Sequence, residues 1–327
     1  MAFQITVGKT VSALESREGS LALSLSSPLL RGTGTECLFP DELHLETMDE
    51  GLVLGHAGEL LVFAQVSPLE RNIAAQTKRY YQQLLSHLVD YSLLRIWNYI
   101  PAINAIDRGM EHYQAFCVGR AEAFEMHFAA HGLEARYPAG SAVGIKGDQM
   151  VMYGVACRSR EEAHYFENPD QIPAYRYPPR YGPKPPSFSR ASVFNHVSGE
   201  VVYISGTASV IGHETRHPHQ IDKQLQTTKS LLDSLFDQLE WSKGGPLSAD
   251  WLHQANLCLY LRDASAAPLA ETWMRTHFPL ADGHWRMVQA DLCRSDLVAE
   301  IEVSLHPLMQ RQTQPTPLYA SADASPF

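Results

Sequence analysis

The sequence predicts an α+β protein built from two related units. An apolar run that follows a Gly-Glu pair occurs twice, at 58–67 (GELLVFAQVS) and at 199–209 (GEVVYISGTAS). Each run is typical of a buried strand, and each is followed by a stretch with apolar residues at helical spacing. Because the same order of elements then recurs in both halves, we infer an internal duplication.

Each half reads as strand, strand, helix, strand, helix, strand, strand. The expected helices are 69–91 and 111–131 in the first half, and 219–241 and 268–278 in the second. The remaining expected strands are 93–99, 141–145 and 150–156, and in the second half 256–262, 285–292 and 297–305. We expect the last two strands of each half to pair, and the helices to cover one face of each mixed sheet. Such sheets can join edge to edge and leave a cleft, a common place for a small-molecule site.

The pattern predicts four segments along the chain. They are an N-terminal unit (1–165), a connecting loop (166–191), a C-terminal unit (192–310) and a flexible tail (311–327). The loop is rich in Pro, Tyr and basic residues, so it is either a stiff linker or a preformed wall over the cleft. The tail has little to bury, which favours mobility.

Composition excludes several classes of function. The formal net charge is -10, and no run of Lys or Arg suggests a nucleic-acid partner or an anionic membrane surface. The N-terminus has no signal-peptide pattern and no long apolar span follows, so we expect a cytoplasmic protein. The five cysteines are scattered, and neither a metal site nor a nucleotide-binding glycine loop is indicated. We therefore expect no cofactor and no metal.

Glu300 is the strongest candidate for chemistry because it lies near the middle of the last strand, roughly where the first half has Tyr153. Strand alternation places Glu300 and Glu302 on one face, and pattern alone favours solvent for both. A tight turn at 294–296 would bring Cys293 and Glu300 onto neighbouring antiparallel strands, where both could line one cavity. The alternative for Cys293 is a small buried hydrophobe.

Other candidates lie in or beside predicted strands of the second unit. Gly206, within Ser205-Gly206-Thr207-Ala208, marks either a bulge or the close approach of a ligand or another backbone. Arg190, Arg262 and Arg286 are either surface charges or ligand-binding groups, and we expect at most one or two of them to face a ligand.

Four segments resemble the chorismatase family, which is itself similar to the Rid/YjgF fold. They are YPAGSAVGIKGD, AYRYPPRYGPKPPSFSRA, ISGTASVIGHETRH and ADLCRSDLVAEIE, in this order between about residues 90 and 305. The resemblance implies two fused Rid/YjgF-like units, a monomer, and a site in the C-terminal unit with Glu300 as the acid. It also implies substrate-binding residues, for which the candidates are Arg190, Tyr177, Tyr181, Gly206, Thr207, Ala208, Arg262 and Arg286.

The resemblance further implies that the small-molecule substrate is chorismate. Glu300 would protonate the terminal methylene of the enolpyruvyl group, and Cys293 and Gly206 match the subgroup that forms 3-hydroxybenzoate and pyruvate. Chorismate carries two carboxylates, so Arg and Tyr donors are expected around it. Three alternatives stay open: hydrolysis to a dihydroxy-cyclohexadiene acid or a mixed 3-/4-hydroxybenzoate output, Rid-like imine hydrolysis, and non-catalytic binding of a metabolite.

Overall fold

The computed structural model describes residues 2–39, 41–132, 135–158, 163–196, 199–242, 254–278, 280 and 282–306. The predicted tail at 311–327 lies outside these residues. No helix in the described ranges is long and apolar enough to cross a lipid bilayer.

Within the described residues, the first unit is a six-stranded sheet with two helices. Its elements are β6 (His44–Thr47), β7 (Val53–Ala57), β8 (Leu60–Pro68), α1 (Ile73–His87), β9 (Ser92–Pro101), α2 (His112–His131), β12 (Ala139–Ile145) and β13 (Gln149–Cys157). The strand order is β12-β9-β13-β8-β7-β6. The side chain of Asn72 caps the start of α1, and α2 ends at Gly132, whose φ of 60° suits glycine.

The second unit is a seven-stranded sheet, with two helices in the part of it that the structure describes. Its elements are β14 (Ala163–Phe166), β15 (Ala191–His196), β16 (Gly199–Ala208), α3 (Ile221–Ser242), β19 (Asn256–Leu261), α5 (Ala267–His277), β20 (Trp285–Gln289) and β21 (Ala299–Leu305). The strand order is β14-β15-β16-β21-β19-β20-β4, where β4 (Leu29–Gly32) comes from the N-terminal segment.

The two units share one topology. In chain order, the strands β7, β8, β9, β12 and β13 occupy the same relative places as β15, β16, β19, β20 and β21. The predicted duplication and the α+β class are therefore confirmed. The predicted pairing of the last two strands is wrong, because β9 lies between β12 and β13, and β19 between β20 and β21. In the first unit β12 runs parallel to β9, and the chain then crosses β9 to reach β13 on its other side. In the second unit β20 runs parallel to β19, and the chain crosses β19 to reach β21.

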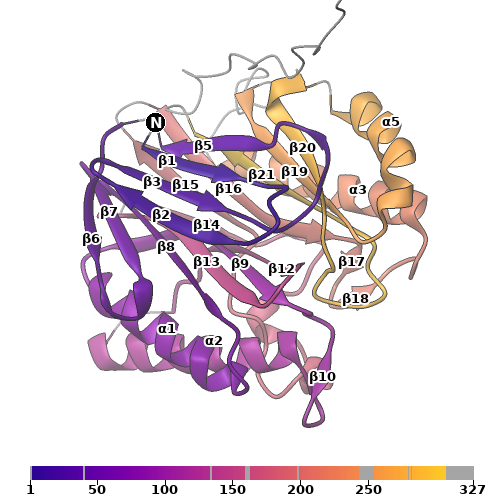
Figure 1. Cartoon of the computed structure of the whole chain (residues 1–327). Coiled ribbons are helices and arrows are strands. Elements are labelled where there is room, and N and C mark those ends of the chain that lie inside the picture. Colours follow the sequence, from indigo (N-terminus) through magenta and orange to yellow (C-terminus); the bar gives the residue numbers. More distant parts are fainter. Residues whose placement is uncertain are drawn as a thin grey trace, which may run out of the picture.

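Helices cover the outer face of each sheet, as predicted. Apolar residues of α1 and α2 pack on the first sheet, and those of α3 and α5 pack on the second. In Figure 1 the two pairs of helices lie on different sides of the molecule. The opposite, inner faces of the two sheets carry none of the described helices and pack against each other.

The inner faces pack together through buried aromatic side chains and do not join edge to edge. The Tyr99 and Tyr260 hydroxyls, one from each sheet, are hydrogen-bonded at 2.9 Å, and the rings of Trp97 and Tyr203 meet edge to face at 5.9 Å. A third sheet closes this core, formed by β1 (Phe3–Thr6), β2 (Ala13–Arg17), β3 (Ser20–Ser24) and β5 (Thr35–Phe39).

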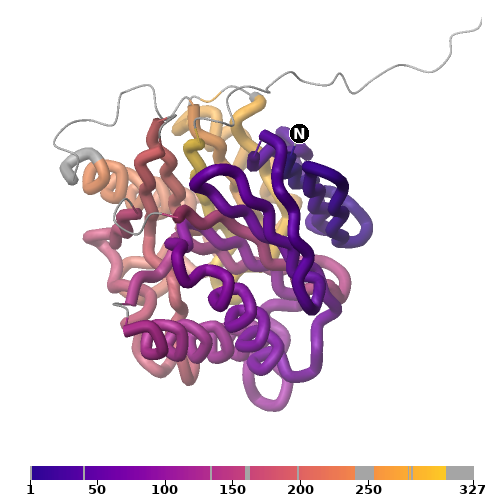
Figure 2. Tube along the Cα trace, turned by 90° about the vertical axis from the view of Figure 1, so that its left-hand side faces the viewer, coloured from indigo at the N-terminus to yellow at the C-terminus, as the bar shows by residue number. Residues whose placement is uncertain are grey.

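The N-terminal segment is therefore tied to the second unit as well as to the first. Strand β4 pairs with β20, which brings the start of the chain beside its C-terminal strands (Figure 2). The predicted bounds of the two units stay a prediction.

The remaining described elements are short. Two of them are two-stranded sheets, formed by β10 (Ile106–Asp107) with β11 (Met110–Glu111) and by β17 (Val210–Ile211) with β18 (Glu214–Thr215). The others are short 3-10 helices at Asp49–Gly51, Ala174–Arg176, Pro179–Tyr181, Ala264–Ala266 and Asp282–His284.

Candidate active site

A cavity of about 500 Å³ lies where the two units meet. Its walls come from α2, the 167–190 segment, β16, the 210–215 turn, the 290–298 loop and β21. The segment rich in Pro and Tyr thus forms one wall of the cavity. Seven of the ten predicted site residues line this space: Glu300, Cys293, Arg190, Tyr177, Tyr181, Gly206 and Ala208.

Glu300 brings a buried carboxyl group to the cavity. Alternation along β21 sends Ala299 and Ile301 to the helix side and Glu300 to the inner side. Glu300 is only 4% exposed, so the solvent-facing position that pattern alone favoured is wrong. Burial, and then the charge of Glu302, raise the pKa of Glu300 to about 8, against the opposing effect of Arg95 and Arg190. This carboxyl group is mostly protonated at neutral pH.

Gly206 leaves the space that the Glu300 carboxyl group occupies. The pairing of β16 with β21 shifts between Ile204 and Thr207, which makes a bulge at Ser205 and Gly206. A Cβ atom at position 206 would overlap with Oε1 of Glu300 and would lie 3.0 Å from Oγ of Ser141. A larger residue at position 206 would therefore force the Glu300 carboxyl group to shift.

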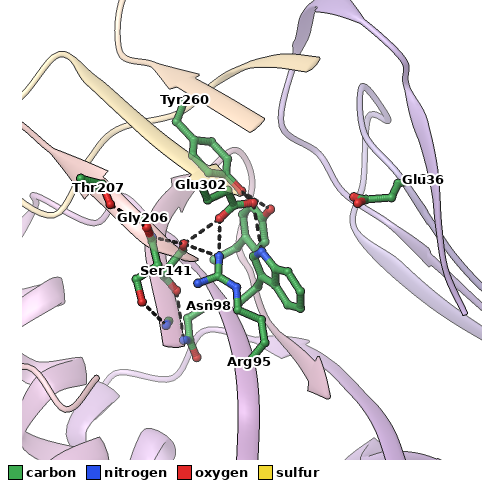
Figure 3. A network of polar contacts seen from close by, with 12 residues as sticks. Glu36, Arg95, Asn98, Ser141, Gly206, Thr207, Tyr260 and Glu302 are labelled. Atoms are coloured by element: carbon green, nitrogen blue, oxygen red, sulfur yellow. Dashed lines mark hydrogen bonds and ion pairs between the residues drawn. The ribbon is translucent and has the colours of Figure 1, made fainter. Parts of the chain in front are cut away.

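Glu302 lies one step further along the same face and is held by a buried network (Figure 3). Its carboxylate accepts hydrogen bonds from Arg95 and Ser141 through Oε2, and at 3.0 Å each from Trp97 and Tyr260 through Oε1. Ser141 also accepts the backbone N–H of Gly206 at 3.0 Å. The network thus joins both units directly beneath Glu300 and fixes a negative charge there.

Two cavity-lining arginines form no ion pair with any described residue. Arg190 donates to the Tyr177 hydroxyl at 2.8 Å and to the Ile172 carbonyl at 3.3 Å. Arg294 donates to the His213 carbonyl at 2.9 Å and lies 4.2 Å from the centre of the Tyr181 ring. Two guanidinium groups without carboxylate partners suit a ligand that carries two carboxylates.

Other cations of the cavity already have partners. Arg180 pairs with Glu214 at 3.0 Å, and Lys184 pairs with Glu125 of α2 at 2.8 Å. The second of these ion pairs ties the 167–190 segment to the first unit. Arg190 and Arg294 are thus the cations left to meet a bound anion.

Cys293 lies in the 290–298 loop and not on a strand. The prediction that Cys293 and Glu300 lie on neighbouring antiparallel strands is wrong, because β19 separates β20 from β21. Both side chains nevertheless line the same cavity, as predicted. Burial, and then the nearby Glu300, raise the pKa of Cys293 to about 12, so the group is a neutral thiol and not a thiolate nucleophile.

Three predicted substrate-binding residues lie outside the cavity lining. Arg262 donates to the carbonyls of Arg294 and Leu297, both at 2.8 Å, and so supports the loop that carries Cys293. Arg286 is buried and pairs with Glu36 of the N-terminal sheet at 2.8 Å. Thr207 is buried, and its hydroxyl donates to the Ser205 carbonyl at 3.0 Å.

Several lining residues were not predicted. Arg294 stands next to Cys293 but was assigned only to the turn, and Gln171 and Lys184 lie in the loop. Tyr113 and Cys117 come from the first unit, one helical turn apart on α2. Their spacing was visible in the sequence, but no local signal says that this part of α2 reaches the other unit.

Comparison with known proteins finds chorismatases and a 3-hydroxybenzoate synthase among the proteins similar to this chain. A family model described as "Chorismatase FkbO/Hyg5-like, N-terminal" matches residues 38–156. The chain is 35% identical to a 3-hydroxybenzoate synthase of Streptomyces hygroscopicus, over 77% of this chain and 76% of that protein. It is 39% identical to a chorismatase of Streptomyces rapamycinicus over 42% of this chain and 41% of the relative. A crystal structure of a chorismatase aligns with 93% of this chain and 92% of its own, at a TM-score of 0.79 and 24% identity.

Proposed function

Because the chain belongs to the chorismatase family, we propose that it converts chorismate to pyruvate and 3-hydroxybenzoate. The observation that carries this proposal is the buried Glu300 carboxyl group, whose pKa burial raises. It faces a cavity that also holds Arg190 and Arg294, which form no ion pair with the described residues. A positioned carboxylic acid is the group that cleavage of an enol ether needs. The relative named 3-hydroxybenzoate synthase supports the choice of ring product.

Binding begins with the two carboxylates of chorismate. We assign one to Arg190, which the Tyr177 hydroxyl orients, and the other to Arg294, which stacks on Tyr181. Guanidinium groups bind carboxylates through paired hydrogen bonds, and the aromatic rings can flank the substrate ring. This arrangement leaves the enolpyruvyl methylene to be placed against Glu300.

The first chemical step is transfer of the Glu300 proton to the terminal methylene, which makes a methyl group and an oxocarbenium ion. The ring hydroxyl next to the ether carbon then attacks that carbon, the ether C–O bond breaks, and its electron pair leaves with pyruvate as the ketone oxygen. Formation of the arene-oxide-like intermediate releases the hydroxyl proton, which can return to Glu300. Opening of this ring gains one proton and aromatisation loses one, so no redox partner is consumed.

The rate is expected to fall as the pH rises through about 8. The reactive form of Glu300 is the protonated one, and burial raises the pKa of Glu300 to about 8. Below that pH the acid is present, and above it the rate falls by about tenfold per pH unit. The pH dependence of kcat for pyruvate release measures this, and a rate that still rises between pH 8 and 9 would contradict the role of Glu300 as an acid.

Cys293→Ala is expected to divert product from 3-hydroxybenzoate toward the non-aromatic diol. The neutral thiol fills the cavity beside Glu300, and its loss makes room for a water molecule that can attack the oxocarbenium ion in place of the ring hydroxyl. Chromatography with mass detection gives the product ratio. An unchanged ratio would remove the role assigned to this thiol.

The function itself is tested by incubating the purified chain with chorismate and no added cofactor. Pyruvate is followed with a coupled lactate dehydrogenase, and the ring product is identified by mass. We expect equal amounts of pyruvate and 3-hydroxybenzoate. Pyruvate with the diol or with 4-hydroxybenzoate would keep the reaction class and change the mechanism, while no pyruvate would refute the proposal.

A further inference from the structure

Arg120 of α2 is a buried cation that forms no ion pair with any residue the structure describes. It is 2% exposed, and its Nε and Nη2 atoms have no hydrogen-bond partner in the described parts of the chain. Its guanidinium group lies 4.7 Å from the centre of the Phe116 ring. The groups with the strongest electrostatic effect on it are Tyr81, Cys117 and Tyr113, none of which is charged at neutral pH.

Two other buried arginines of this chain, Arg95 and Arg286, do have acidic partners. Arg95 pairs with Glu302, and Arg286 pairs with Glu36 at 2.8 Å. A buried charge costs free energy unless it is paired, because it loses its hydration. The folded protein therefore carries at Arg120 a cost that it avoids at Arg95 and Arg286, which calls for a physical reason.

Arg120 lies directly behind the wall of the cavity. Cys117 is one helical turn before it, and both Cys117 and Tyr113 line the cavity. Arg120 acts on both of these side chains, since its charge opposes the effect of burial on the pKa of the Cys117 thiol and of the Tyr113 hydroxyl. Its positive potential thus reaches the cavity through side chains that a ligand would touch, although Arg120 itself does not line the space.

We propose that Arg120 is a positioning residue whose unpaired charge acts as a buried counter-charge for the dianionic substrate. This inference rests on the proposed function. The empty protein bears the cost of an uncompensated cation, and a bound dianion relieves that cost across a wall of low polarity, where charges interact more strongly than in water. Because the substrate charge is present before any chemistry, the benefit falls on binding and not on the protonation step.

The decisive variant is Arg120→Met, which keeps an unbranched stem but removes the guanidinium group and its charge. We expect the Tm of the ligand-free protein to rise by a few degrees, since an unpaired buried charge is replaced by an apolar group. We expect KM for chorismate to rise on the order of tenfold, with kcat changed by less than about threefold. Arg120→Lys, which keeps the charge, should retain most of the affinity.

Direct binding separates affinity from turnover. In a Glu300→Gln background, where chorismate should stay intact, calorimetry with and without Arg120→Met is expected to show the same loss of affinity, on the order of tenfold. Arg286→Met is the matched control, because it leaves the partly buried Glu36 without its cation and should lower the Tm. The proposal therefore predicts changes in Tm of opposite sign, a rise for Arg120→Met and a fall for Arg286→Met.

A lower Tm for Arg120→Met, or a variant that does not fold, would show that Arg120 is structural and would overturn the inference. An unchanged affinity for chorismate would overturn it as well. If the wild-type chain releases pyruvate while Arg120→Met binds chorismate normally, only this inference fails. If the wild-type chain neither binds nor cleaves chorismate, the proposed function fails and this inference fails with it.

Discussion

Glu300→Gln is expected to lower kcat for pyruvate release by a factor of about 10² to 10⁴, the range typical of a lost general acid. The amide has nearly the shape of the acid but cannot supply the proton. Because Arg190 and Arg294 and not Glu300 are assigned to the substrate carboxylates, the Kd for chorismate should change by less than about threefold. Single-turnover assays of pyruvate and calorimetric titration with chorismate measure the two quantities separately.

Glu271→Gln is a suitable control for this experiment. Glu271 is a glutamate of α5 that pairs with Arg31 and Arg275, away from the cavity lining. Its replacement should leave kcat and KM unchanged. Full activity in Glu300→Gln would move the proton donor to another group, whereas equal losses of kcat and affinity would indicate a damaged site and not a missing acid.

Gly206→Ala is expected to lower kcat on the order of 10²-fold, because displacement of a catalytic group by about 1 Å can have an effect of this size. One methyl group at this position would overlap with Oε1 of Glu300 and crowd Oγ of Ser141. The carboxyl group must then rotate away from the cavity or push against the buried Glu302 network. Steady-state kinetics with chorismate measures the loss.

Gly34→Ala serves as the control for Gly206→Ala. A Cβ atom at Gly34, in the N-terminal segment, would lie 3.2 Å from the end of the Leu29 side chain and 4.0 Å from the Val7 carbonyl oxygen. We expect normal kinetics for that variant. A Gly206→Ala enzyme with unchanged kcat would mean that the position of the Glu300 carboxyl group is not restricted as the structure suggests.

The order of elements could be predicted from the sequence because it depends on local periodicity. The apolar runs at 58–67 and 199–209 became β8 and β16, and all four expected helices are present within a few residues of their predicted ends. Strand pairing could not be predicted in this way. Whether a strand returns beside its predecessor or crosses over the middle strand depends on how the helix packs, which periodicity along one strand does not report.

For the candidate site too, features that depend on local sequence could be predicted, and features that depend on distant contacts could not. The motif around Cys293 and Glu300 was sufficient to place both in one cavity, but the burial of Glu302 depends on Arg95, which lies 207 residues away in the chain. Arg286 had the sequence position of a ligand-binding residue, yet its partner is Glu36 of the N-terminal sheet. The burial of Glu302 and the role of Arg286 both depend on contacts with distant parts of the chain, which the residue pattern of a single strand does not predict.

The proposed reaction requires Glu300 to be a neutral acid at physiological pH. Infrared difference spectra of the wild type against Glu300→Gln, recorded across a pH series, test this protonation state most directly. We expect a carboxylic acid C=O band that is present at pH 7, absent from the variant, and lost with a midpoint near the pKa of about 8. A band that disappears near 4.5, the ordinary pKa of a glutamate, would contradict this expectation, because Glu300 would then be a carboxylate when the enzyme works.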